Sequence, residues 1–279
     1  IRSGAFGNCS SLKEVKIPEG IKWINPGCFR GCESLTNIDL PSSIKRIKPR
    51  AFKGCTSLAS INIPESVVEI GDQAFMHCIS LQKINLPKNI EHFGYDLFWG
   101  SGLKEVNLDE ITALSNEDPW IDIPNGMFAY TPIEKVILPK YTAFIGHRAF
   151  MGCENLATVD IPDSVYGIGS SAFENCRKLK NIKLPKELVY IEESSFKNCE
   201  AITDISVPSN VSYISYYAFE GCANLESVQL SGNDALKRIE RSAFRECSRL
   251  SSISLPDTVR YLGYNSFDGC TNLKSVNLN

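Results

Sequence analysis

The chain has 279 residues and a formal net charge of −3, with 43% hydrophobic and 22% charged residues. This soluble composition excludes a disordered chain, which would lack the apolar surface needed to fold. No run approaches the roughly 18 apolar residues of a membrane span. No basic cluster suggests a nucleic-acid partner.

A phenylalanine that recurs at a fixed interval indicates that the chain is a tandem repeat. Eight of the eleven intervals in this set are 23 residues, and the other three are 22, 25 and 30 residues. Self-similarity at such a period is typical of a solenoid, in which each coil is one repeat. The members of the set are Phe6, Phe29, Phe52, Phe75, Phe98, Phe128, Phe150, Phe173, Phe196, Phe219, Phe244 and Phe267.

The first repeat predicts the path of one coil. Polar and apolar residues alternate over residues 14–17, which indicates a half-buried strand. Pro18 then ends the strand, because proline has no N–H for the ladder. Ile21 and Ile24 are then expected to point into the core from a second side of the coil. Cys28-Phe29 closes the coil. One repeat cannot bury its apolar side chains alone, so neighbouring coils are expected to stack.

A cysteine stands three residues after the phenylalanine in ten of the repeats. This shared position favours a ladder of buried thiols, while parallel side chains on adjacent coils give poor geometry for the alternative, disulfides. No C-x-x-C motif or His-Cys cluster suggests a metal site, and no cofactor is expected. Two repeats with a shorter turn carry Ser101 and Thr131 instead. The predicted structural ladder is Cys9, Cys32, Cys55, Cys78, Cys153, Cys176, Cys199, Cys222, Cys247 and Cys270.

The pattern Leu-x-x-Ile-x-Ile-Pro-x-x-Val-x-x-Ile-Gly-x-x-Ala-Phe-x-x-Cys resembles the BspA-type leucine-rich repeat of bacterial surface and secreted proteins. It is clear from Leu58 to Cys78 and from Leu156 to Cys176, and it extends over essentially the whole chain. The resemblance implies an α/β fold by leucine-rich-repeat convention, built as a β-rich right-handed solenoid of about twelve 23-residue coils. It also implies parallel strands on the concave face and short helical turns at the Ala-Phe-x-x-Cys segments.

The repeats are expected to form a single domain over residues 1–279. Because the chain begins and ends within a repeat, the terminal repeats are truncated, which suggests an excerpt of a longer protein. An acidic insertion at about residues 109–126 interrupts the period and carries Trp120. Insertions in solenoids often form binding loops. A tolerated bulge with Trp120 packed on the solenoid explains the insertion equally well.

Tyrosines gather at outward positions in the last third of the chain. Their rings offer a large contact area at little cost in entropy, which fits a protein or glycan partner. The alternative is that tyrosines only cover a strand wall, because they are good strand residues. The predicted partner-binding residues are Tyr190, Tyr213, Tyr216, Tyr217, Tyr261 and Tyr264, together with Trp120.

No G-x-S-x-G, P-loop or H-E-x-x-H motif is present, and outward strand residues such as Glu14 and Lys16 are mixed in type. The chain is therefore not expected to be an enzyme, although some parallel solenoids act on polysaccharides. The resemblance implies an adhesion-type binding module of a cell-surface or secreted protein. Its expected partners are host extracellular-matrix proteins, surface proteins or glycans. The alternative function is a passive spacer that displays another domain.

Overall fold

The computed structural model describes residues 1–111, 120–230 and 232–278. The chain divides into two compact units, Ile1–Pro139 and Lys140–Asn279. Whether the two units act as one domain stays a prediction.

The first unit contains β1 (Trp23–Ile24), β2 (Asn37–Asp39), β3 (Arg46–Ile47), β4 (Ser60–Asn62), β5 (Glu69–Ile70), β6 (His92–Phe93), β7 (Glu105–Asn107), β8 (Ile121–Ile123) and β9 (Lys135–Ile137). The second contains β10 (Thr142–Ile145), β11 (Gly167–Ile168), β12 (Tyr190–Ile191), β13 (Asp204–Ser206), β14 (Tyr213–Ile214), β15 (Ser227–Gln229), β16 (Arg238–Ile239), β17 (Ser252–Leu255), β18 (Tyr261–Leu262) and β19 (Ser275–Leu278).

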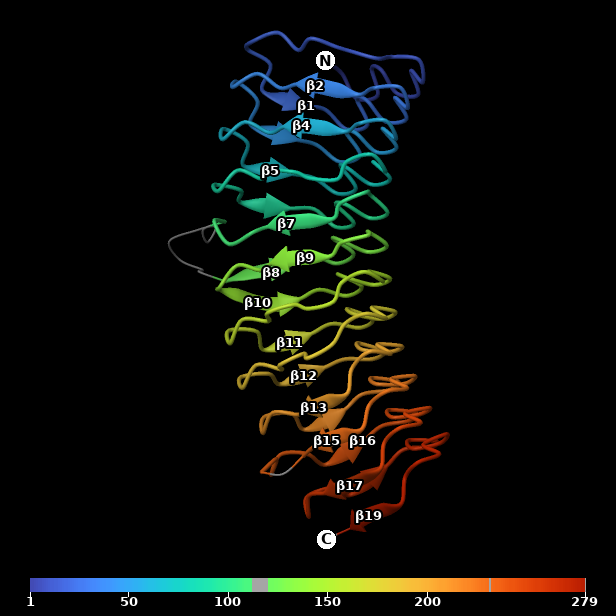
Figure 1. The fold of residues 1–279 in the computed structure, drawn as a ribbon. Coiled ribbons are helices and arrows are strands. Elements are labelled where there is room, and N and C mark those ends of the chain that lie inside the picture. Colours follow the sequence, from blue (N-terminus) through green and yellow to red (C-terminus); the bar gives the residue numbers. More distant parts are fainter. Residues whose placement is uncertain (112–119, 231, 279) are drawn as a thin grey trace. The chain divides into compact units, whose positions relative to one another are not determined.

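Within each unit the strands stack into two walls, and strands pair in parallel with the equivalent strand of a neighbouring coil (Figure 1). The first wall consists of β2, β4, β7 and β9 in one unit and β13, β15, β17 and β19 in the other. The second wall consists of β1, β3, β5, β6 and β8 in one unit and β10, β11, β12, β14, β16 and β18 in the other. Its register joins residues one repeat apart, as in Trp23 with Arg46. The solenoid has about 11 coils rather than the expected twelve.

The recurring phenylalanines stack ring on ring inside each unit. From Phe6 to Phe128, neighbouring ring centroids lie 5.4 to 5.8 Å apart. From Phe150 to Phe267 the separation is 5.2 to 5.5 Å. Such separations suit offset aromatic stacking. The rings sit in a core of Ile, Leu, Val and Cys side chains, so each coil buries its apolar face against its neighbours.

The short helical turns predicted at the Ala-Phe-x-x-Cys segments are wrong, since the described residues form strands and turns but no helix. In the coil of Phe52, Arg50 and Gly54 have φ angles of 60° and 73°, and the same two positions have positive φ in the other repeats. An α-helix requires negative φ throughout. In addition, the N–H groups of Phe52 and Gly54 donate to Ala74 and Met76 of the next coil, at 2.9 and 2.8 Å. Amides used between coils cannot form helical hydrogen bonds, so the segment is a series of tight turns.

Candidate functional site

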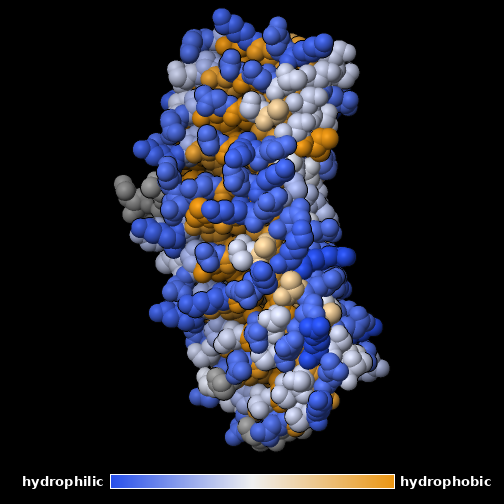
Figure 2. Space-filling view, viewed as in Figure 1, coloured by the Kyte–Doolittle hydropathy of each residue, from blue (hydrophilic) through white to orange (hydrophobic). Residues whose placement is uncertain are grey.

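The first wall presents polar side chains to solvent. β2, β4 and β7 each show the exposed–buried–exposed alternation of a half-buried strand. On the face drawn in Figure 2, hydrophilic side chains are widely spread, with hydrophobic residues visible between them. This wall offers polar contacts along its length.

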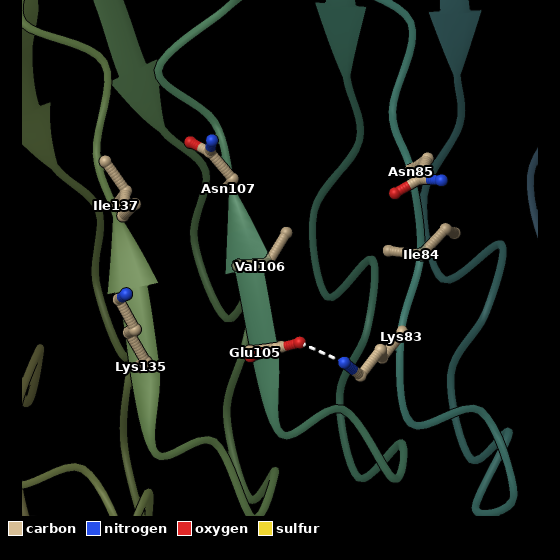
Figure 3. A pocket seen from close by; sticks show the side chains of 8 residues that line it. All are labelled: Lys83, Ile84, Asn85, Glu105, Val106, Asn107, Lys135 and Ile137. Carbon is tan, nitrogen blue, oxygen red and sulfur yellow. Dashed lines mark ion pairs between the residues drawn. The ribbon is translucent and has the colours of Figure 1, made fainter.

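A shallow depression of about 260 Å³ lies on the first wall of the first unit. Figure 3 shows its lining side chains, with Glu105 of β7 directed toward Lys83. The two form an ion pair, and the hydrogen bond from Lys83 lowers the pKa of the Glu105 carboxyl. A general acid needs a raised carboxyl pKa instead. The depression therefore suits binding of a polar group better than acid–base chemistry.

A serine, a histidine and a carboxylate meet in the second unit. Ser170 Oγ donates to Glu192 Oε2 at 3.0 Å, and His147 Nδ1 lies 3.2 Å from the same oxygen. The backbone N–H of Ser170 donates to His147 Nδ1 at 3.0 Å. In a hydrolytic triad the hydroxyl donates to the imidazole and the carboxylate orients the other ring nitrogen. Here the hydroxyl donates to the carboxylate, so the geometry does not activate Ser170.

The predicted cysteine ladder lies inside the coils, apart from Cys9, which is exposed, and no cysteine forms a disulfide. Cys176 Sγ donates to the carbonyl oxygen of Phe150 in the preceding coil at 3.1 Å. Seven other ladder thiols make the same contact. Burial raises the pKa of Cys55 and Cys222 to about 12. A thiol that stays protonated is a poor nucleophile and metal ligand. The structural role of the ladder stays a prediction.

The described residues contain no group of three or more His, Cys, Asp or Glu side chains that could hold a metal ion. In the same part of the chain, no helix has the length and apolar character needed to cross a membrane. Most of the acidic insertion, residues 112–119, lies outside the described residues. Trp120, which follows it in the first unit, has an exposed side chain.

The predicted tyrosines lie on or beside the second wall of the second unit. Tyr190, Tyr216, Tyr261 and Tyr264 are exposed, with 76% of Tyr264 accessible, while Tyr213 and Tyr217 are half-buried. Parallel pairing places Tyr213 and Tyr261 on either side of Arg238. The structure therefore gathers five of the six tyrosines on three successive coils. Tyr190 lies one coil earlier.

Sequence reasoning missed cationic and aromatic partners on the same wall. The guanidinium of Arg238 lies over the Tyr261 ring, 4.1 Å from its centroid, and Arg241 lies 5.8 Å from the centroid of Tyr217. Arg238 and Arg241 stand at the same distances before Phe244 as Tyr213 and Tyr216 stand before Phe219. Their spacing from the recurring phenylalanine could therefore have identified them.

Phe144 and Tyr166 form a further aromatic pair on this wall, with ring centroids 5.8 Å apart. A Cβ atom at Gly167 would approach the Phe144 ring to 2.5 Å. The glycine thus leaves room for the ring to lie across the next coil. Tyr166 is exposed. It was not predicted because it stands one residue before Gly167, which occupies the repeat position of Tyr190.

Parallel strands on two walls, a stacked phenylalanine core and a polar outer face define a solenoid of the leucine-rich-repeat class. The family model described as "BspA type Leucine rich repeat region (6 copies)" matches residues 1–117, 121–247 and 230–279. The chain belongs to this family of BspA-type leucine-rich repeats, as its sequence pattern predicted.

Solved structures of bacterial leucine-rich-repeat proteins share the fold. A leucine-rich repeat protein from Bacteroides ovatus is 30% identical, with a TM-score of 0.81, over 98% of this chain and 74% of that one. A leucine rich cell surface protein from Faecalibacterium prausnitzii is 24% identical, with a TM-score of 0.54, over 99% and 82% of the two chains. A leucine-rich repeat protein from Eubacterium ventriosum is 19% identical, with a TM-score of 0.56, over 92% and 82%. No curated protein matches the chain.

Proposed function

We propose that this chain is a non-catalytic, adhesion-type protein-binding module of a bacterial cell-surface or secreted protein. Membership of the BspA-type family supports a role in protein interaction. The description of the Faecalibacterium neighbour as a cell surface protein supports the proposed location. Host extracellular-matrix proteins are the proposed partner class.

The exposed tyrosines on the second wall of the second unit are the observation that carries this proposal. Tyr216, Tyr261 and Tyr264 expose a large part of their side chains on coils held rigid by the stacked core. Tyrosine and arginine are the residue types that most often dominate binding energy at protein interfaces. Because the wall is already ordered, a partner that packs on it orders few side chains on binding.

Replacing Tyr213, Tyr217 and Tyr261 together by Ala should abolish saturable binding to an extracellular-matrix protein. Loss of one central aromatic hot spot weakens an interface by about 30-fold or more. Tyr213 and Tyr217 lie on one coil, and Tyr261 lies two coils further along, beyond Arg238. The measurement is surface plasmon resonance of the chain against immobilised matrix proteins, with glycans as a second panel.

The matched control replaces Tyr95 and Tyr130, which are also exposed but belong to the first unit. Circular dichroism establishes that each variant is folded before binding is compared. Equal loss of affinity in the control would remove the second wall as the site. A folded parent chain that binds neither panel would contradict the binding function and favour a passive spacer.

A further inference from the structure

Tyrosine and basic residues form a regular array on three successive coils of the second unit. In the register of β14, β16 and β18, Arg238 pairs with Tyr213 on one side and Tyr261 on the other. Three residues later, the corresponding side chains are again tyrosine, arginine and tyrosine. One residue before the strands, the backbone N–H of Lys237 donates to Ser212 and that of Arg260 donates to Lys237, at 2.8 and 2.9 Å. The Tyr–Arg array consists of Ser212, Lys237, Arg260, Tyr213, Arg238, Tyr261, Tyr216, Arg241 and Tyr264.

Three cations of the array have no acidic partner among the described residues. Arg238 is neutralised by Glu240, whose Oε1 lies 2.6 Å from Arg238 Nε. The ion pairs found in the described residues do not include Lys237, Arg241 or Arg260, and all three side chains are exposed. The array therefore carries a local positive charge, although the whole chain has a net charge of −3.

Two of the four cations of the array lie over tyrosine rings, while Arg260 donates to the backbone carbonyl oxygens of Asp257 and Val259. The Arg238 guanidinium lies over Tyr261, and the Arg241 guanidinium lies over Tyr217 at the edge of the array. The N–H donors of Arg238 are used by Glu240, whereas Arg241 makes no ion pair among the described residues and can bind a carboxylate in a bidentate manner. The exposed tyrosines between the cations provide apolar contact area.

We propose that the Tyr–Arg array binds an acidic protein segment in which Asp or Glu alternates with apolar side chains. This inference rests on the proposed binding function and specifies the chemistry of the partner. Charge complementarity supports an acidic occupant, since positive and negative surfaces attract across interfaces. The alternation of rings and cations favours a mixed segment over a uniformly charged polyanion, which would place charge against the rings.

Fluorescence anisotropy of the full chain with a labelled peptide of Glu-Leu-Glu-Gly repeats tests this inference. The double variant Arg241→Gln and Arg260→Gln should weaken binding by about tenfold, since each change removes a charged contact. The double variant Lys180→Gln and Lys186→Gln removes two exposed charges elsewhere in the second unit and should bind like the parent chain. The same peptide with Gln in place of Glu should not bind saturably.

Three results with the peptides would overturn the inference. The parent chain could fail to bind the acidic peptide, the Arg variant could bind it as tightly as the parent, or the Gln peptide could bind as well as the Glu peptide. Heparin is the probe for a sulfated polysaccharide. If heparin alone binds and the Arg variant loses it, the array is a polyanion site. If the tyrosine variants lose a matrix protein while the Arg variant retains it, the acidic-segment inference fails and the proposed binding function stands.

Discussion

Raising the pH above about 9 is expected to unfold this protein, because the buried thiols then stay protonated in the folded state while those of the unfolded chain ionise. Burial raises the pKa of Cys28 and Cys270 to about 11 and that of Cys55 and Cys222 to about 12, from an ordinary value of 9.0. It also raises the pKa of five further thiols: Cys32, Cys78, Cys176, Cys199 and Cys247.

The direction of this effect follows from proton binding. Below pH 9.0 the thiols are protonated in both states, so their ionisation does not favour unfolding. Above it the unfolded chain loses protons that the folded chain keeps, and each such thiol lowers the free energy of unfolding by about 1.4 kcal/mol per pH unit. Because several buried thiols contribute in the same direction, the loss per pH unit is expected to be a substantial part of the whole stability of an ordinary domain. The loss continues until the folded state also ionises, from about pH 11 at Cys28 and Cys270.

Urea unfolding at a series of pH values, under reducing conditions, measures this slope. Replacing Cys176 and Cys199 by Ala lowers stability at neutral pH, because each change leaves a small cavity. The pH dependence is a separate readout, and it should become shallower by about 3 kcal/mol per pH unit, since two titrating thiols are removed. An unchanged slope in the double variant would show that other groups cause the alkaline transition.

Replacing Phe173 by Ala is expected to lower the free energy of unfolding by about 3–5 kcal/mol. The ring is fully buried and stacks on Phe150 and Phe196, with centroid separations of 5.2 and 5.4 Å. Its removal leaves a cavity between two coils and breaks both stacking contacts. Because each repeat is stabilised mainly by its neighbours, the loss should affect the coils on both sides.

Phe267→Ala is the matched control, measured by urea unfolding with circular dichroism. This ring is only partly buried, and among the described rings it stacks on Phe244 alone, at 5.5 Å. Its removal should cost about half as much as that of Phe173, since about half of the contacts are lost. Equal losses at the two positions would contradict a stability that is summed over neighbouring coils.

The 23-residue period alone predicted the stacked coils. Phe29, Phe52 and Phe75 could be recognised as one ladder because a solenoid places equivalent residues directly above one another. The strands of the first wall were equally clear, since polar and apolar residues alternate in segments such as Asn37–Asp39. Regular spacing thus identified both the core and the outward positions.

The turns around each phenylalanine could not be predicted in the same way. The left-handed backbone is occupied by Arg50 and Gln73 in two coils and by glycine in others, so no residue type marks the position. The helical turn was expected only from the resemblance to leucine-rich repeats, since no residue at these positions marks a left-handed backbone. The structure shows that hydrogen bonding to the next coil determines the backbone there.

The candidate site was only partly predictable, because its tyrosines are recognisable individually while their partners depend on register. Tyr213 and Tyr261 are separated by 48 residues in the sequence, yet both lie beside Arg238. The repeats at Phe219, Phe244 and Phe267 had to be aligned across a two-residue insertion before this arrangement could appear. The net charge of the array could not be predicted either, because it depends on which of its arginines form ion pairs, as Arg238 does with Glu240.

Hydroxyl-radical footprinting of the chain, alone and with a bound matrix protein, tests the proposed binding surface most directly. The method reports the solvent exposure of individual tyrosine side chains. Binding through the second wall predicts protection of Tyr216, Tyr261 and Tyr264, with Tyr95 and Tyr130 of the first unit unchanged. Protection confined to Tyr95 and Tyr130, or a bound partner that leaves all five rings equally exposed, would contradict this account.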